Sequence, residues 1–211
     1  MTTSAPNLTQ TPAGAPAVWA HWVLKTARSD RLIRWYSEVF GASVVHASER
    51  VVFLSWDTEH HRLAVVRMPK PLLLLGWLMR ASRKFYRLDH IAFSFPSLQS
   101  LLELYRRLSL KGIKPVWSIN HGPTTSIYYE DPDGNRLEFQ CDNYSTLEAC
   151  TRFMEGPEFR DNPIGVNFDP DYLYERMRQG VPEAELLRPG AGTPPGKKLA
   201  SGMRAINWRT L

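Results

Sequence analysis

Two histidines and one glutamate lie in predicted β-strands, at positions whose side chains point away from the large apolar residues beside them. His21 opens the segment HWVLKT, His90 opens HIAFSF, and Glu138 lies inside RLEFQCD. The large apolar residues of each segment take the alternate positions, so we expect these three side chains on the opposite face. Two imidazoles and a carboxylate suit ferrous iron, manganese or a related divalent ion and leave coordination positions for substrate and dioxygen. Taken singly, each has an ordinary interpretation as a hydrogen-bonded or solvated residue, and only their coincidence favours a metal site.

An internal repeat places the two histidines at equivalent positions. Residues 20–42 align without a gap with residues 89–111 at a constant offset of 69, which sets His21 on His90. Each copy predicts a short strand, a turn and an amphipathic helix. We expect Ser29 and Ser97 as the N-caps of these helices, with Gly41 and Gly112 just after them.

Three β-rich stretches follow each predicted helix. They are residues 44–45, 51–56 and 63–68 in the first copy, and 115–119, 126–130 and 136–142 in the second. The turn signal DPDGN joins the last two. The sequence therefore predicts an α+β fold of paired βαβββ modules that form an open curved sheet around one metal cleft.

Composition shifts divide the chain into an arm, a central domain and an extension. We expect a disordered N-terminal arm over residues 1–18, because it is rich in Pro, Thr and Ala. The central domain spans 19–145, with modules 19–69 and 87–145 and an insert over 70–86. The remainder, 146–211, reads as a short helix, a loop, another short helix and a flexible PGAGTPPGKK tail. The apolar insert fits a buried helix or dimer contact best, then a lid over a large aromatic substrate, and then an interfacial anchor.

Composition limits the partners that this chain can have. Lys and Arg exceed Asp and Glu by 26 to 21, but no basic run with interleaved aromatic residues indicates nucleic acid. The longest apolar run, LLLLGWLM, is too short to span a bilayer, so membrane association is not expected. Two cysteines and the lack of a secretory pattern in the first residues predict a reducing, cytoplasmic setting.

The motifs HWVLKT, LDHIAFSF and HGPTTSIYYEDPDGNRLEFQCDNY resemble the vicinal oxygen chelate superfamily, which includes glyoxalases, bleomycin resistance proteins and dioxygenases. Within it they are most similar to single-domain type I extradiol ring-cleavage dioxygenases related to biphenyl-2,3-diol dioxygenase. The later segment NPIGVNFDPDYL is similar to the C-terminal extension of that group. The resemblance implies a non-heme iron(II) enzyme that opens the ring of a catechol-type aromatic diol with dioxygen. It also implies a homo-oligomer.

The resemblance also implies a role for each candidate residue. Iron, or alternatively manganese, would be held by His21, His90 and Glu138. In EHHRLAVV, expected to be a strand, the second histidine of the pair, His61, would accept the proton of the bound diol, while His60 would point outward. The other predicted catalytic residues are Tyr128, which would hydrogen-bond the substrate hydroxyl or the oxygen adduct, and His121, a loop histidine that would contact the diol.

Two other functions stay open at this point. A glyoxalase-like isomerase or lyase would use the same metal to stabilise an enediolate, usually with four protein ligands. The first module ends in LAVVRMP without a carboxylate, which counts against this alternative. A metal-free small-molecule-binding module is the remaining alternative, but it would have no use for the full set of three ligands with His61 and Tyr128.

Overall fold

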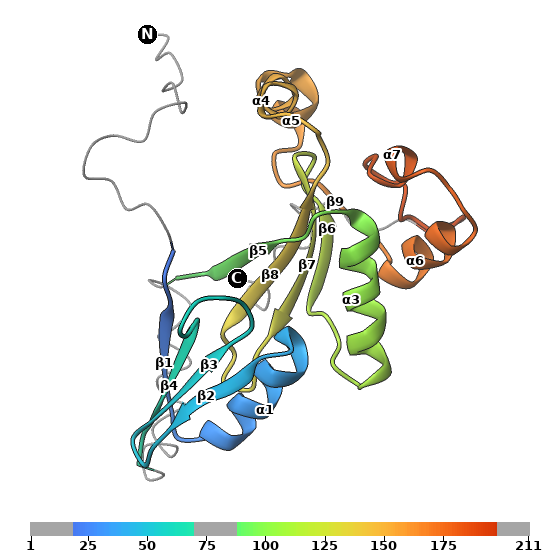
Figure 1. Cartoon of the computed structure of the whole chain (residues 1–211). Helices are drawn as coiled ribbons and strands as arrows, with labels where there is room; N and C mark the ends of the chain where they lie inside the picture. Colours follow the sequence, from blue (N-terminus) through green and yellow to red (C-terminus); the bar gives the residue numbers. More distant parts are fainter. Residues whose placement is uncertain (1–18, 70–87, 198–211) are drawn as a thin grey trace, which may run out of the picture. The chain divides into compact units, whose positions relative to one another are not determined.

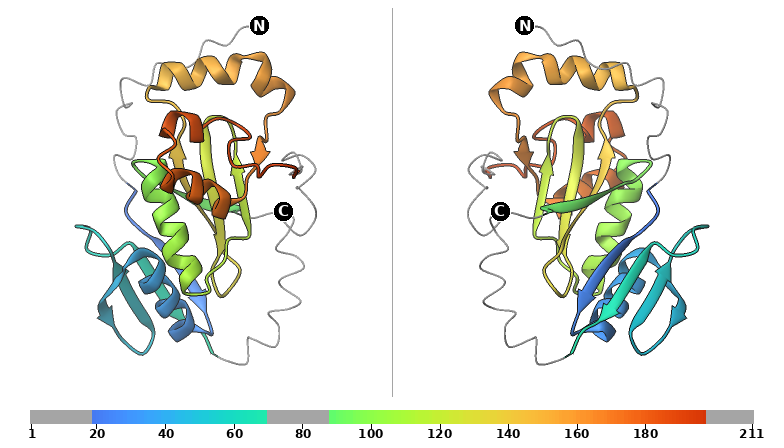
Figure 2. Two further views of the ribbon diagram at one scale, coloured as in Figure 1. Left: turned by 90° about the vertical axis from the view of Figure 1, so that its right-hand side faces the viewer. Right: turned by 90° about the vertical axis from the view of Figure 1, so that its left-hand side faces the viewer.

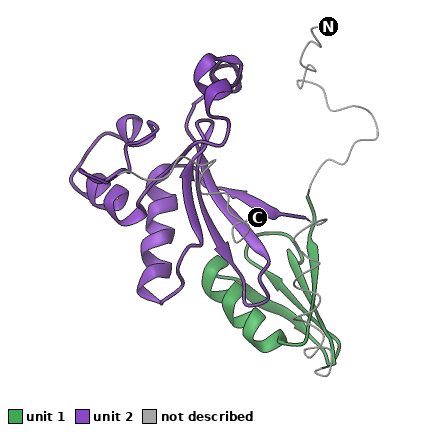
Figure 3. Cartoon of the chain, turned by 180° about the vertical axis from the view of Figure 1, so that it is seen from behind, with its two compact units in different colours: residues 1–73 green, residues 74–211 purple. Residues whose placement is uncertain are grey.

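The computed structural model describes residues 19–69 and 88–197 (Figure 1). The predicted arm, the insert and the last residues of the predicted tail lie outside the described residues. The chain divides into two compact units, residues 1–73 and residues 74–211, coloured separately in Figure 3.

Unit 1 is a four-stranded mixed sheet with one helix against it. Its elements are β1 (Trp22–Thr26), α1 (Ser29–Phe40), β2 (Ser43–Ala47), β3 (Val51–Ser55) and β4 (Leu63–Arg67). The strand order is β1-β4-β3-β2, with β1 and β4 parallel and the other pairs antiparallel. Helix α1 buries Leu32, Tyr36 and Val39, which are spaced to share one face of a helix.

Unit 2 repeats this plan and extends it. The repeated elements are β5 (His90–Ser94), α3 (Leu98–Leu110), β6 (Trp117–Asn120), β7 (Thr124–Glu130) and β8 (Arg136–Asp142). The added elements are α4 (Leu147–Glu155), α5 (Pro157–Asp161), β9 (Val166–Asn167), α6 (Pro170–Arg178) and α7 (Glu183–Leu186). The strand order is β5-β8-β7-β6-β9, and β5 and β8 are the parallel pair. Figure 2 shows α3 along one face of this sheet, with α6 beside it.

The shared strand order confirms the predicted α+β class and the duplicated βαβββ pattern. Helices α1 and α3 begin at Ser29 and Leu98, which keeps the 69-residue offset found in the sequence. The predicted facing of β1 is also confirmed, because Trp22 and Thr26 are buried while Val23 is 50% exposed. In both copies of the βαβββ module the first strand runs parallel to the fourth, and the helix and two strands between them provide the long connection that a parallel pair requires.

Three sequence-based expectations about local structure are wrong. Ser29 is not the N-cap of α1, because Arg28 holds that position without a side-chain hydrogen bond and Ser29 is already helical. The prediction for α3 is confirmed, because the Ser97 hydroxyl accepts a hydrogen bond from the Ser100 backbone N–H. In its described residues, 146–197, the extension contains β9 and four short helices rather than two helices alone. The predicted flexible tail is packed in part, because Gly192 is buried and its carbonyl accepts a hydrogen bond from the Asp169 backbone N–H, whereas residues 195–197 are exposed. Among the described residues, no helix has the length and apolar character needed to cross a membrane.

The two serines provide a direct test of helix capping. Ser97→Ala should lower the free energy of unfolding by about 1 kcal/mol, because it leaves an N-terminal backbone donor of α3 without its acceptor. The matched change Ser29→Ala should cost clearly less, since that hydroxyl caps nothing. Urea denaturation of both variants measures the difference. Equal losses would contradict the cap assignment.

Candidate active site

The centre of the candidate site is a carboxylate buried in the sheet of unit 2. Glu138 lies in β8 between two strands, paired with Ala92 of β5 and with Tyr128 of β7, and it is only 5% exposed. The Tyr128 hydroxyl donates to its Oε1 at 2.8 Å, and His90 Nε2 lies 2.9 Å from its Oε2. Ser126 of β7 donates a further hydrogen bond.

These hydrogen bonds decide the charge of Glu138. Burial alone would raise the pKa of the carboxyl, but the hydrogen bonds from His90, Ser126 and Tyr128 outweigh burial and leave the pKa below its ordinary value. In turn, burial and the neighbouring carboxylate raise the pKa of the Tyr128 phenol. At neutral pH this part of the site is therefore an ionised carboxylate facing a protonated phenol.

His90 is held from both sides by carboxylates. Its Nδ1 lies 2.7 Å from Asp89 Oδ2, so the ring donates on one side to Asp89 and on the other to Glu138. The hydrogen bond to Glu138 is the largest cause that raises the pKa of His90 to about 9, with desolvation opposing it. A carboxylate behind a histidine is the arrangement that usually fixes the ring of a metal ligand. Arg136, the β8 partner of His90, lies 3.7 Å from Asp89 Oδ1 and completes the support.

The spacing of the two donor atoms fits a metal ion. Metal bonds to imidazole nitrogen and carboxylate oxygen are about 2.0–2.2 Å long, as for zinc, so an octahedral ion with bonds of this length would set neighbouring donor atoms about 3 Å apart. The observed separation of His90 Nε2 and Glu138 Oε2 is 2.9 Å. Nitrogen and oxygen donors of this kind also suit iron and manganese. Within residues 19–69 and 88–197, no three His, Cys, Asp or Glu side chains already form a metal-binding group, so the predicted ligand set stays a prediction.

The Tyr128 hydroxyl lies within hydrogen-bond distance of both Glu138 and His121. His121 lies in the loop between β6 and β7, and its Nε2 is 3.1 Å from the Tyr128 hydroxyl. Burial lowers the pKa of His121, so the ring is neutral near pH 7. The phenol carries one proton and faces two acceptors, a carboxylate oxygen and an imidazole nitrogen. The hydroxyl can donate to only one of these acceptors at a time, and its shorter contact, at 2.8 Å, is the one to Glu138 Oε1.

Unit 1 brings His21 and His61 together. His21 immediately precedes β1, and its ring centroid is 4.4 Å from that of His61, which stacks in turn on Phe53 of β3 at 4.4 Å. Burial, followed by the nearby charges of His21 and His60, lowers the pKa of His61. A neutral imidazole can accept a proton at pH 7.

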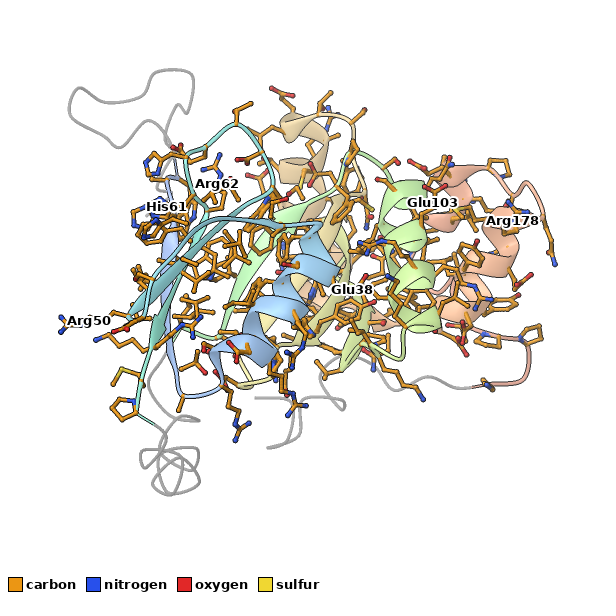
Figure 4. The ribbon with its side chains drawn as sticks, turned by 60° about the horizontal axis from the view of Figure 1, so that its bottom comes forward. Glu38, Arg50, His61, Arg62, Glu103 and Arg178 are labelled. Carbon is orange, nitrogen blue, oxygen red and sulfur yellow. The ribbon has the colours of Figure 1, made fainter. Side chains whose placement is uncertain are left out.

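The expected strand position of His61 is wrong. His61 lies in the loop before β4, directly before Arg62, and Figure 4 labels both residues. The ion pair of Arg62 with Asp57, at 2.9 Å, closes this loop. The alternation argument for an outward His60 therefore does not apply, and the Nδ1 atoms of His60 and His61 lie only 2.5 Å apart. His60 is nevertheless the exposed member of the pair.

The structure thus groups four of the six predicted site residues in unit 2 and two in unit 1. Sequence reasoning did not assign Asp89, although it stands directly before His90 in the quoted motif LDHIAFSF. It also did not assign Trp117, whose ring stacks on Tyr128 with centroids 4.9 Å apart. The acidic residue before a strand histidine could have been recognised as a support for a metal ligand.

Comparison with known proteins shows the family of the chain. Residues 19–139 match the Glyoxalase/Bleomycin resistance protein/Dioxygenase superfamily. The chain belongs to this superfamily. It is 42% identical over 167 residues to biphenyl-2,3-diol 1,2-dioxygenase 3 of Rhodococcus globerulus, covering 79% of this chain and 85% of that protein. It is 40% identical over 164 residues to biphenyl-2,3-diol 1,2-dioxygenase 2 of the same organism, covering 78% and 83%.

A solved structure of lactoylglutathione lyase from Agrobacterium tumefaciens is similar to the chain at 18% identity. The structural match covers 60% of this chain and 94% of the lyase chain, with a TM-score of 0.45. The resemblance to the glyoxalase and dioxygenase superfamily that the motifs suggested is confirmed by the family match and the two Rhodococcus globerulus relatives.

The strand register shows which residues stand at equivalent positions in the two copies of the βαβββ module. In unit 2, Glu138 pairs with Tyr128, and Tyr128 pairs with Trp117. At the same register positions in unit 1, Ala64 pairs with Phe53, and Phe53 pairs with His46. The first copy thus has alanine where the second has the carboxylate. This agrees with a three-ligand set rather than with a fourth ligand from the first module.

The raised pKa of His90 has a measurable consequence in metal-free protein. The imidazole should titrate near pH 9, as followed by NMR, against about 6.5 in an unfolded chain. The pairing therefore stabilises the fold fully below pH about 6.5, and this contribution is lost as the pH rises through about 9. Glu138→Gln should lower the midpoint, since it removes the main cause of the shift. Glu103→Gln, an exposed change on α3, should leave it unmoved, and a wild-type midpoint near 6.5 would contradict the assignment.

Proposed function

We propose that this protein is a non-heme iron(II)-dependent extradiol dioxygenase that cleaves the aromatic ring of a catechol-type diol with dioxygen. The observation that carries the proposal is the buried, ionised Glu138 with His90 and Tyr128 on it, in a chain about two-fifths identical to two biphenyl-2,3-diol 1,2-dioxygenases. Both relatives are covered over most of their length, so the proposal concerns the whole described fold.

The metal ligands in this proposal are His21, His90 and Glu138. His90 Nε2 and the Glu138 carboxylate have the donor chemistry and spacing described above. The inclusion of His21 rests on its position in the repeat, which is equivalent to that of His90. When bound, iron would hold the two adjacent oxygens of the diol and carry electrons from the diol to dioxygen. Manganese is the alternative ion for the same donors.

The remaining residues bind the diol and move its protons. His61, neutral because burial lowers its pKa, would accept the proton of one diol hydroxyl. Tyr128 stays protonated because burial raises the pKa of its phenol, so it would donate a hydrogen bond to a substrate oxygen. His121, also neutral, would accept a hydrogen bond from the diol or from Tyr128.

The setting of the enzyme is part of the same proposal. Its substrates would be an aromatic diol and dioxygen, with no nucleic acid partner. Cys141 and Cys150 are both free, which supports a reducing, cytoplasmic setting. The domain division into arm, central domain and extension, and the homo-oligomeric state, stay predictions from the sequence.

The decisive experiment measures iron and oxygen consumption together. Anaerobically purified protein should contain stoichiometric iron, consume dioxygen with 2,3-dihydroxybiphenyl and form a yellow ring-opened product. Bound metal without oxygen use across a panel of monocyclic and bicyclic catechols would favour a glyoxalase-like isomerase or lyase. No bound metal after reconstitution would favour a binding module and overturn the proposal.

Alanine variants test which residues hold the metal. His21→Ala, His90→Ala and Glu138→Ala should each lose most of the bound iron, because two donors hold an ion far less tightly than three. His46→Ala is the matched control, an exposed histidine of β2 that should keep its iron and activity. His61→Ala should keep its iron and lose turnover. Metal analysis with oxygen uptake separates these cases, and normal iron in any of the first three removes that residue from the set.

A further inference from the structure

A backbone carbonyl from the C-terminal extension contacts the predicted catalytic histidine. His121 Nδ1 lies 2.6 Å from the Ile164 carbonyl oxygen. A carbonyl oxygen only accepts, so the Nδ1 atom carries the proton in this contact. The opposite nitrogen, Nε2, then faces the Tyr128 hydroxyl at 3.1 Å.

The segment that supplies this carbonyl is attached to β6 at several points. Strand β9 pairs with β6 in antiparallel register, with Asn120 opposite Val166. The Trp117 indole N–H donates to Asn167 Oδ1 at 2.9 Å. Before β9, the Asn162 side chain closes a tight turn, because its amide donates to the Gly165 carbonyl and its oxygen accepts from the Gly165 N–H.

Gly165 allows the extension backbone to lie this close to the His121 loop. Its φ is +107°, and a Cβ atom there would lie 2.1 Å from the Asn120 carbonyl oxygen and 2.6 Å from His121 Cα. No side chain fits within these distances, so only glycine lets the extension press against the His121 loop. The contact depends on one residue whose replacement must move the Ile164 carbonyl.

We infer that residues 162–167 are positioning residues for the proposed reaction: through the Ile164 carbonyl they hold the His121 ring with Nε2 directed at the Tyr128 hydroxyl. Without this contact the ring could turn about its χ angles, and the neutral ring could carry its proton on either nitrogen. With it, Nε2 is the acceptor of the hydrogen bond that the phenol or the diol can donate. The extension thus has a role in the site beyond covering the sheet edge.

This inference rests on the proposed function for its effect on turnover, but not for its structural content. The tautomer of His121 is measurable without any catalysis, from the ring ¹⁵N shifts of full-length protein labelled in its six histidines. The spectra are recorded on metal-free protein and on protein loaded with diamagnetic zinc. His121→Asn assigns the signals by removing them.

Gly165→Ala is the test variant and Gly180→Ala its control. Both glycines have positive φ, at +107° and +81°, but a Cβ at position 180 meets nothing within 4 Å. The control therefore carries the backbone cost of alanine without the clash. Wild type and Gly180→Ala should show His121 as the single Nδ1–H form, and Gly165→Ala should show a mixture of tautomers.

Kinetics separates positioning from general loss of structure. Gly165→Ala should lower kcat/KM by about tenfold to a hundredfold while iron content stays unchanged, as expected for a misplaced catalytic group. In a His121→Asn background the same change should cost almost nothing further, because the group that it positions is already gone. An equal loss in both backgrounds, or unchanged His121 signals in Gly165→Ala, would overturn the inference.

Asn162→Ala is the milder second variant if Gly165→Ala does not fold. It removes the side chain that closes the turn at Gly165 but introduces no clash, so a smaller shift toward mixed His121 tautomers is expected. An unaltered His121 tautomer in this variant would likewise count against the inference. If wild-type protein cleaves no diol, the proposed function fails, and the ¹⁵N signals still decide whether the extension positions His121.

Discussion

A carboxylate buried in the middle of a sheet is the constraint on which the rest of unit 2 depends. Taking a charged group out of water costs several kcal/mol unless close partners replace the water. Glu138 obtains those partners from the strands on both sides, His90 at the start of β5 and Tyr128 on β7. This requires β5 to lie parallel to β8 and β7 to lie antiparallel to it, each in one register. A slip of one residue would turn each partner to the opposite face and leave the charge unpaired.

The duplicated module carries this arrangement only once. Both units have the same strand order, yet the position of Glu138 holds Ala64 in unit 1, and the position of Tyr128 holds Phe53. With alanine in place of the carboxylate, the first copy needs no phenol at the position of Phe53, and the Phe53 ring instead stacks against His61. One copy therefore supplies an acidic, hydrogen-bonded centre and the other supplies paired imidazoles. The same scaffold thus carries a buried, ionised carboxylate in one copy and a neutral imidazole in the other, and the proposed function would use the first as a metal ligand and the second as a base.

The sequence predicted the repeated elements well because their signals are periodic and are present twice. The 69-residue offset and the alternation in β1 depend only on side-chain spacing, which the backbone geometry obeys. What it missed depends on contacts between distant residues. Strand β9 has two residues and forms only because β6 offers an open edge. The loop position of His61 depends on the Asp57 and Arg62 ion pair, and no pattern along the chain indicated it.

The residues that the site needs differ in how firmly the fold can hold them. Glu138 and Tyr128 lie on strands whose ladders fix their direction. His121 has less support, because it lies in the turn between β6 and β7, where the strand register ends at Asn120 and one further backbone hydrogen bond, from the His121 N–H to the Thr124 carbonyl, closes the turn. A loop residue must be oriented by something outside the loop, and the extension supplies a carbonyl for this purpose. A carbonyl is well suited to this role because its acceptor character does not change with pH, whereas a carboxylate would add a second charge beside Glu138 and raise the free energy of both. The extension therefore orients a neutral histidine without disturbing the charge balance on which the buried carboxylate depends.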